Sequence, residues 1–227
     1  MNAYPTFGID LIPSRGDNGK TAGRKTGRSP GAGRLCALAL VAMLLLSGAA
    51  AANTLQGPQP FPFGVALMAP VQYPAEDVSV TGFRFSLFYG RNAEVMGLDI
   101  GALVSAADGD VFGMQISGLV NNIGSSSGTI QFAGIANNCY EDFCGCQLSG
   151  IANRAGGTVQ GGQIGCFNLA GDLSGIQIGV YNKAANSIGL QIGVVNETSS
   201  MQGIQIGLIN MIRQSPVPFC PIFNMYF

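Results

Sequence analysis

Side chains that carry chemistry are scarce in this chain of 227 residues, which contains no histidine. Without imidazole there is no Ser-His-Asp or Cys-His arrangement and no histidine metal site. The segment "DGD" at 108–110 lacks the further ligands and the closing Glu of a calcium loop. Asp99 stands where later units carry Gln, and we interpret it as a capping variation. We therefore predict no catalytic residue, no metal site and no cofactor, and we expect the protein not to be an enzyme.

The cysteines gather in "CYEDFCGC" at 139–146, with a further thiol at Cys166. No His lies near this segment, and its spacing is not that of a zinc site, so metal binding is the weaker interpretation. In an oxidising compartment thiols tend to pair. We expect a disulfide that closes a loop, and the candidate partners are Cys139, Cys144, Cys146 and Cys166.

Charge divides the chain into a leader and a body. Residues 1–52 hold six basic and two acidic residues (+4), whereas the remainder holds 11−6 = 5 basic and 12−2 = 10 acidic residues (−5). The body therefore has no cationic footprint for nucleic acid. The basic start, the apolar run "LCALALVAMLLL" and the small residues of "SGAAAAN" predict a secretory signal sequence over 1–52. An uncut signal anchor is the alternative, and a lead-in segment follows at 53–77.

The elements that position these residues are repeats. Short segments related to "GIQIGVYN", which we call the phrase, recur through a predicted β-repeat domain over 78–227. Each repeat unit begins with one phrase, and the units start at 82, 97, 113, 129, 145, 161, 175, 189 and 203. From 97 onward successive starting positions differ by 16 four times and then by 14 three times. Such regular spacing indicates one structural unit stacked many times.

Two amide residues recur in these units and mark the structural repeat positions. They are Gln115, Gln131, Gln147, Gln163, Gln177, Gln191 and Gln205, with Asn121, Asn137, Asn153, Asn168, Asn182, Asn196 and Asn210 closing the phrases. Within a phrase Ile176 and Ile178 face one way and Gln177 the other, as in a strand. We expect the apolar side to form the core and the Gln side to be solvated, with a Gln–Gly binding surface as the alternative. The Asn suits a turn because it tolerates the left-handed conformation.

Two ways of stacking the units compete. An eight-residue strand spans about 23 Å at about 3.3 Å per residue, and six further residues barely return to its start. A parallel solenoid would thus have to bend inside the phrase, whereas five or six residues make an ordinary hairpin loop. Antiparallel neighbours would also bring Cys146 and Cys166 together. We predict an all-β fold in which an antiparallel β-meander closes into a shallow barrel-like body, with a short-coil parallel β-solenoid as the alternative.

The phrases G-[IL]-Q-I-G-[VL]-x-N over about 78–227 resemble a bacterial surface-repeat family, first recognised in spirochaetes, whose members carry tandem "GLQIGLxN" units behind a signal sequence. The resemblance implies a place at the cell surface and a shallow closed β-architecture, and it brings no biochemical activity. We expect an exported, non-enzymatic surface or periplasmic protein of a bacterium that acts as a rigid β-scaffold for binding. The alternative is a small outer-membrane β-barrel with an anchoring or transport role. Outer-membrane association or a surface ligand would supply the partner.

Overall fold

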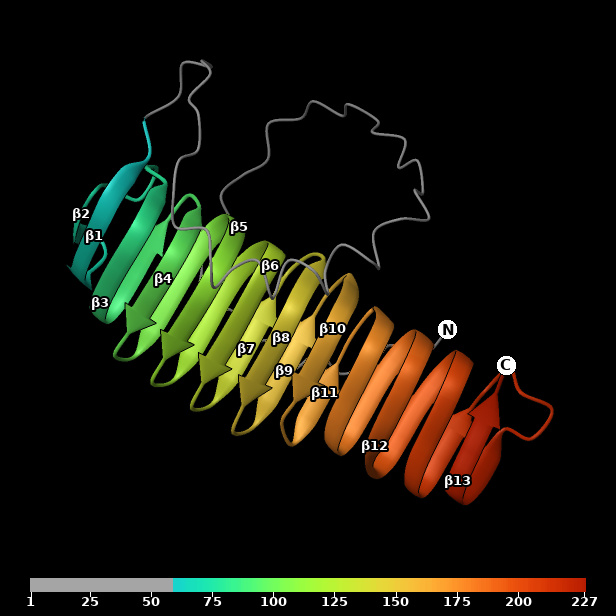
Figure 1. The fold of residues 1–227 in the computed structure, drawn as a ribbon. Helices are drawn as coiled ribbons and strands as arrows, with labels where there is room; N and C mark the ends of the chain where they lie inside the picture. The colour runs from blue at the N-terminus through green and yellow to red at the C-terminus, as the bar shows by residue number, and fades with distance from the viewer. Residues whose placement is uncertain (1–58) are drawn as a thin grey trace, which may run out of the picture. The chain divides into compact units, whose positions relative to one another are not determined.

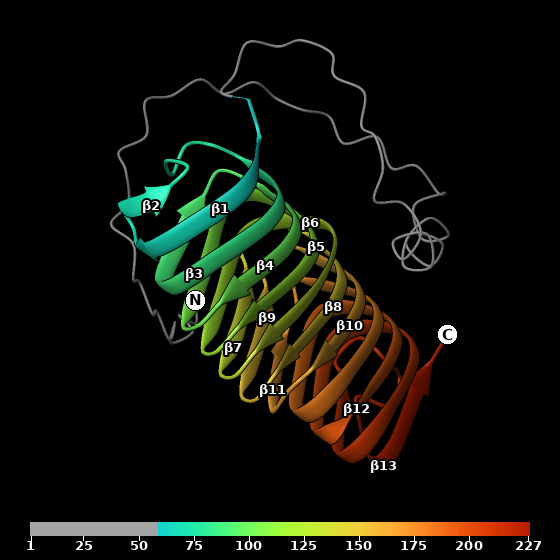
Figure 2. The same cartoon turned by 60° about the vertical axis from the view of Figure 1, so that its left-hand side comes forward.

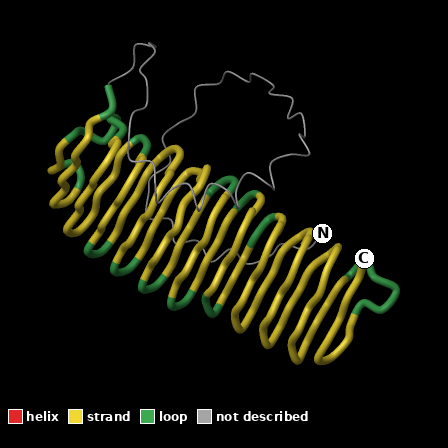
Figure 3. Tube along the Cα trace, in the orientation of Figure 1, coloured by secondary structure: helices red, strands yellow, loops and turns green. Residues whose placement is uncertain are grey.

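The computed structural model describes residues 59–227, which form a β-solenoid of parallel stacked coils (Figure 1). The predicted signal sequence over 1–52 lies outside the described residues. The coils nest one behind another along a single axis (Figure 2). Strands make up most of each coil, and turns lie at the edges of the earlier coils, whereas the coils of residues 172–212 are strand throughout (Figure 3). The described residues contain no helix. No segment within 59–227 is therefore a helix long and apolar enough to cross a membrane.

The strands belong to one sheet that wraps around the axis. They are β1 (Phe61–Met68), β2 (Val71–Tyr73), β3 (Val80–Asn92), β4 (Val95–Gly101), β5 (Val104–Ser117), β6 (Val120–Ala133), β7 (Ala136–Cys139), β8 (Phe143–Ser149), β9 (Ala152–Ala155), β10 (Thr158–Ile164), β11 (Phe167–Leu169), β12 (Asp172–Ile212) and β13 (Phe219–Tyr226). The long β12 contains the three units that start at 175, 189 and 203.

Each coil has two walls that stack in register on those of the next coil. The first wall carries the Gln, so that Gln147 of β8 pairs with Gln163 of β10. The second wall carries the Asn, so that Asn153 of β9 pairs with Asn168 of β11. Both pairings are parallel. Equivalent residues of successive units therefore lie directly above one another, about 4.8 Å apart.

The predicted antiparallel meander and its barrel-like closure are wrong, and the parallel β-solenoid held as the alternative is the fold. The phrase "GIQIGVYN" is not one strand but a corner with a strand on each side. Gln177 lies in the first wall, in register with Gln163, while Tyr181 and Asn182 lie in the second wall beside β11. The bend that a solenoid requires inside the phrase falls between them, where Gly179 and the exposed Val180 form the edge of the coil.

The expected orientation of the walls is also reversed. Gln177 is 0% exposed, whereas the neighbouring Ile176 and Ile178 are 44% and 39% exposed. A coil this short has a narrow interior, which an amide can fill while it bonds to the identical amide of the next coil. The alternation of the phrase was identified correctly, but its apolar side faces outward.

An apolar cluster fills the other half of the interior. Val111, Phe143, Val159 and Leu173 enter it from the start of the first wall, and Ile123 from the second wall, all at most 2% exposed. The amide half and this apolar half together occupy the inside of each coil. The solenoid thus combines a conventional hydrophobic core with a hydrogen-bonded one.

The first Gly of the phrase is required by the backbone. Gly189 has φ +137°, a conformation that side chains rarely adopt. A Cβ built there would lie 2.0 Å from the carbonyl oxygen of Gly175, the equivalent residue one coil earlier. The repeat of Gly at this position follows from close stacking of the coils at a bend in the first wall.

Each end of the solenoid is covered by a strand that departs from the repeat. At the start, β1 is parallel to β3, and the short β2 pairs with β1 in the antiparallel sense. At the end, β13 runs antiparallel to the last coil of β12 and contains Pro221. Short edge strands and proline restrict further pairing at exposed sheet edges. The two caps therefore limit growth of the solenoid along its axis.

Candidate functional site: amide ladders and an apolar face

The buried Gln side chains form one continuous ladder along the axis. In each step the Nε2 of a Gln donates to the Oε1 of the Gln one coil earlier, as Gln177 does to Gln163 at 2.7 Å and Gln191 to Gln177 at 2.7 Å. The same bond joins every neighbouring pair from Gln115 to Gln205, at 2.7–2.9 Å. All seven predicted Gln positions are 0% exposed, so none presents a Gln–Gly binding surface to solvent.

The Asn side chains form a second ladder with the opposite direction of donation. The Nδ2 of Asn182 donates to the Oδ1 of Asn196 in the following coil at 2.8 Å, and Asn196 donates to Asn210 in the same way. This pattern links all seven predicted Asn positions from Asn121 to Asn210. Each of these side chains is at most 1% exposed. The two ladders therefore orient their amide dipoles in opposite senses.

The second amide hydrogen of each Asn, and of three of the Gln residues, bonds a carbonyl oxygen across the coil or in the next coil. Gln177 Nε2 also reaches the carbonyl oxygen of Lys183 in the second wall, at 3.3 Å. Asn182 Nδ2 reaches the carbonyl oxygen of Ile192 in the first wall of the next coil, at 2.8 Å. Asn210 further bonds the carbonyl oxygen of Gly207 at the corner, at 2.8 Å. The left-handed turn conformation predicted for Asn is wrong, because the seven Asn lie within strands and, among residues 59–227, Ile222 is the one non-glycine residue with a positive φ. Buried amides are thus satisfied both along and across the axis.

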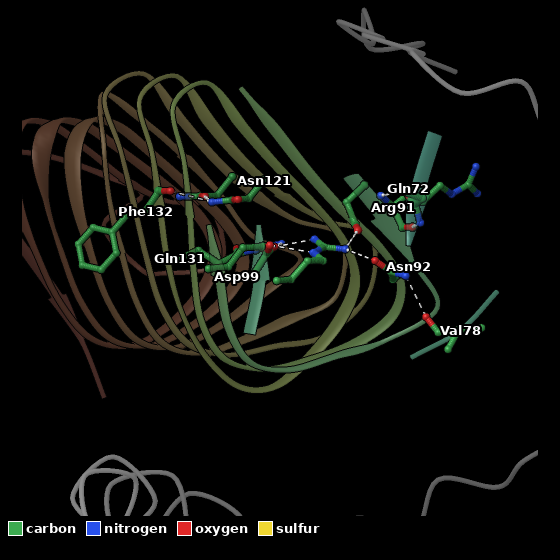
Figure 4. Close-up of polar contacts among 12 residues, drawn as sticks. Gln72, Val78, Arg91, Asn92, Asp99, Asn121, Gln131 and Phe132 are labelled. Atoms are coloured by element: carbon green, nitrogen blue, oxygen red, sulfur yellow. Dashed lines mark hydrogen bonds and ion pairs between the residues drawn. The ribbon is translucent and has the colours of Figure 1, made fainter. Parts of the chain in front are cut away.

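A buried ion pair heads the Gln ladder (Figure 4). Arg84 and Asp99 occupy the Gln position of the first two units, and the guanidinium donates to both carboxylate oxygens at 2.8 and 2.6 Å. Asp99 Oδ2 also accepts the first ladder bond from Gln115 at 2.9 Å. Arg84 is satisfied further by Asn92 Oδ1 and by the carbonyl oxygen of Ala106. Asp99 is therefore a structural cap, and no substrate could reach it without opening the coil.

Each ladder has one end at which two buried polar groups lack a hydrogen-bond partner although their backbones are paired. Gln205 Oε1 and Asn224 Nδ2 have no hydrogen-bond partner among the described residues, although their backbones are directly paired. Ser105 Oγ and Asn121 Oδ1 stand in the same relation at the start of the Asn ladder. Asn224 and Ser105 therefore occupy the position next to the unpaired acceptor of each ladder.

The outer side of the first wall is apolar over its whole length. Its central row is Val65, Phe85, Ile100, Ile116, Phe132, Leu148, Ile164, Ile178, Ile192, Ile206 and Phe223. A parallel row at the corner contains Leu103, Leu119, Ile135, Ile151, Val180, Val194 and Leu208, all 37–67% exposed. A third row, two residues before the central one, includes Phe63, Phe83, Leu98, Met114, Ile130, Ile176, Leu190 and Ile204. We call these three rows the apolar face. No charged side chain projects from it, because Arg84 and Asp99 point inward.

A shallow groove runs along the C-terminal half of the apolar face. It has a volume of about 740 Å³, and its floor includes the backbones of Gly165, Gly179, Gly193 and Gly207. Ile178 stands on one side of it, and Val180 on the other, while Ile222 of β13 lines its end. Ile222 has φ +70°, which is strained for a β-branched residue. The groove contains no charged side chain.

Charged residues collect on the second wall. Lys183 and Arg213 both contact the Glu197 carboxylate, and Tyr181 donates to its Oε2 at 2.7 Å. Burial alone would raise the pKa of Glu197, but the bonds from Arg213 and Tyr181 outweigh it and lower that pKa. Burial and the bond to Glu197 raise the pKa of the Tyr181 hydroxyl to about 12. This hydroxyl therefore stays a hydrogen-bond donor to Glu197 well above neutral pH, and the cluster links the side chains of neighbouring coils.

The predicted loop-closing disulfide does not form between any two of its candidates. Cys139, Cys146 and Cys166 carry free thiols, and parallel stacking places Cys146 beside Gly162 in the first wall. Burial raises the pKa of Cys139 to about 12, and its Sγ lies 3.4 Å from the carbonyl oxygen of Gly124. Cys139 is thus a core residue. Cys144, the fourth candidate, lies in β8 at the edge of the same wall.

Within residues 59–227, no group of three or more His, Cys, Asp or Glu residues could hold a metal ion. Asp110 of the "DGD" segment instead accepts hydrogen bonds from Ser125 and Ser127. Its carboxylate joins neighbouring coils at their edge. The geometry identifies no acid–base pair in contact with the groove.

Two features escaped the sequence analysis: the pair of Arg84 with Asp99 and the exposed apolar face. Arg84 could have been found, because it precedes Asp99 by one unit at the same position of the phrase, and opposite charges stacked in register attract. The apolar face could not, because alternation alone does not say which side of a strand is inside. No protein-family model, curated protein or solved structure matches this chain, so its function rests on the geometry of these two features.

Proposed function

We propose that the protein is an exported, non-enzymatic scaffold of the bacterial surface or periplasm, which binds a partner through its apolar face. One observation carries this proposal: the chain buries its amides and exposes its isoleucines. Ile178 is 39% exposed beside a fully buried Gln177. A soluble monomer rarely shows an apolar patch larger than about 300–600 Å², and larger patches mark interaction sites.

The size of the face supports this role. Eleven layers about 4.8 Å apart give a length of about 48 Å, and three rows give a width of about 16 Å, or roughly 770 Å². That area exceeds the usual patch of a monomer and is close to one side of a standard protein interface, about 800 Å². The face is large enough for specific binding.

The amide ladders support the scaffold part of the proposal. They bond each coil to its neighbours through buried side chains as well as through the backbone, as the Gln163–Gln177–Gln191 steps illustrate. Satisfied buried polar networks specify one packing and resist rearrangement. The apolar rows are consequently held in fixed register.

Photo-crosslinking in cells tests the proposal. A benzophenone amino acid replaces Ile178 on the apolar face or, in the control, Ile209 on the second wall, which is similarly exposed at 40%. We expect crosslinked products from position 178 and few from position 209, with the protein found in the surface or periplasmic fraction. Equal yields at the two positions, or a cytoplasmic protein, would refute the proposal.

A further inference from the structure

Resting on the proposed function, we propose that the partner of the apolar face is a second copy of this chain, bound face to face. The two copies would be related by a twofold axis. Their first walls would then form the two layers of a sandwich.

The first argument concerns area. The face presents roughly 770 Å² per copy by strand geometry, and a standard stable interface buries about 800 Å² per partner. Two such faces would bury a total close to the standard value without any other contact. Neither face need curve or rearrange, because sheets pack face to face about 10 Å apart.

The second argument concerns the shape of the apolar face. Along the C-terminal half, the row of Ile164, Ile178, Ile192 and Ile206 forms a ridge beside the groove of about 740 Å³. A twofold axis places the ridge of one copy over the groove of the other, and the reverse contact follows by symmetry. Ridge and groove occur on the same face with the same period, so this surface carries both halves of an isologous contact.

The third argument concerns charge, and it separates a second copy from a membrane. The body carries five basic and ten acidic residues, a net charge of −5. Arg91, Arg154 and Lys183 lie on the second wall, in strands that pair with β5 or β11. Arg213 pairs with Glu197, which also contacts Lys183 of that wall, and Arg84 is buried. Helices and patches that lie on anionic membranes flank their apolar side with Lys and Arg. The apolar face has no such flank, whereas two uncharged faces approach without repulsion.

Sedimentation equilibrium of the full chain tests the inference. We expect twice the mass of one chain for the wild type at micromolar concentration. Ile178→Glu should weaken the association at least about a hundredfold, because it would place a charge in an apolar interface. The matched control is Ile209→Glu, which adds the same charge on the second wall at nearly equal exposure and should leave the dimer intact. Circular dichroism checks that both variants keep the β-fold.

Thiol labelling gives a second readout on the same samples. Cys166 is exposed in the single chain and lines the groove. A maleimide should therefore label it slowly in the wild type and rapidly in Ile178→Glu. Equal labelling rates in the two proteins would contradict a dimer that covers the groove.

A wild type that stays monomeric at about 100 μM overturns the inference, as does equal disruption by the two glutamate variants. Flotation with vesicles of phosphatidylcholine, with and without phosphatidylglycerol, then separates the two proposals. Flotation of a monomer that Ile178→Glu abolishes would refute the dimer and retain the apolar face as a binding surface, with lipid as its partner. A monomer that neither floats nor crosslinks from position 178 would overturn both.

Discussion

Replacing Gln177 with leucine separates the amide core from the apolar core that alternation alone suggested. Gln177 is fully buried, donates to Gln163 Oε1 at 2.7 Å and accepts from Gln191 Nε2 at 2.7 Å. Leucine has a similar volume but can make neither bond. The substitution leaves one buried acceptor and one buried donor without partners, in addition to the carbonyl oxygen of Lys183.

The expected cost follows from those orphaned groups. Leaving one buried polar group without a partner lowers the free energy of unfolding by about 1–3 kcal/mol. Gln177→Leu leaves two such groups in the ladder, so the expected loss is about 2–6 kcal/mol. For a chain of this size each kcal/mol lowers the melting temperature by about 2–4 °C. We expect a decrease of roughly 5–20 °C, measured by circular dichroism during heating.

The neighbouring Ile178→Gln variant is the control. Ile178 is 39% exposed on the apolar face, so an amide at this position remains solvated. In monomeric protein, Ile178→Gln should therefore change the melting temperature by only a few degrees. If Gln177→Leu melts like the wild type and Ile178→Gln unfolds the protein, the amides face solvent. That result would refute the inverted core.

Three further predictions concern the bend, the ladder head and the buried thiol. Gly189→Ala should prevent folding or lower the melting temperature strongly, because its Cβ would lie 2.0 Å from a carbonyl oxygen. The control Gly162→Ala, whose Cβ would lie 3.3 Å from its nearest atom, should lower it only slightly. Equal melting temperatures for the two variants would contradict the stacking. Arg84→Met should lower the free energy of unfolding, measured with urea, by about 3–5 kcal/mol, because it leaves a buried carboxylate without its partner. Adding Asp99→Asn should recover part of this loss, since the amide oxygen still accepts the first ladder bond. Cys139 should resist a thiol reagent at pH 8 until urea unfolds the protein, because burial raises its pKa to about 12. In the unfolded protein the pKa of this thiol is near its ordinary value of 9.0, so its ionisation should reduce stability as the pH rises from 9 toward 12. Labelling of the folded protein at pH 8 would refute the burial of Cys139.

The sequence predicts much of the local structure. The regular recurrence of the phrase identifies every coil, and the alternation around Gln177 correctly assigns a strand with two distinct sides. Gly at the start of each phrase and Asn at its end occupy the bend and the corner contact, as Gly189 and Asn210 illustrate. The alternation depends on neighbours within one unit, and the period is visible because the units are near copies of one another.

The direction of stacking and the choice of the inner side depend on contacts between units. Gln177 is stable inside only because Gln163 and Gln191 lie directly below and above it, in parallel register. An antiparallel neighbour would not stack identical amides, and the same alternation would then favour Ile178 inside. The period and the two sides of each strand are therefore visible in the pattern of residues alone. Which side is buried depends on the stacking of the coils, because the adjacent coils supply the bonds that satisfy a buried amide.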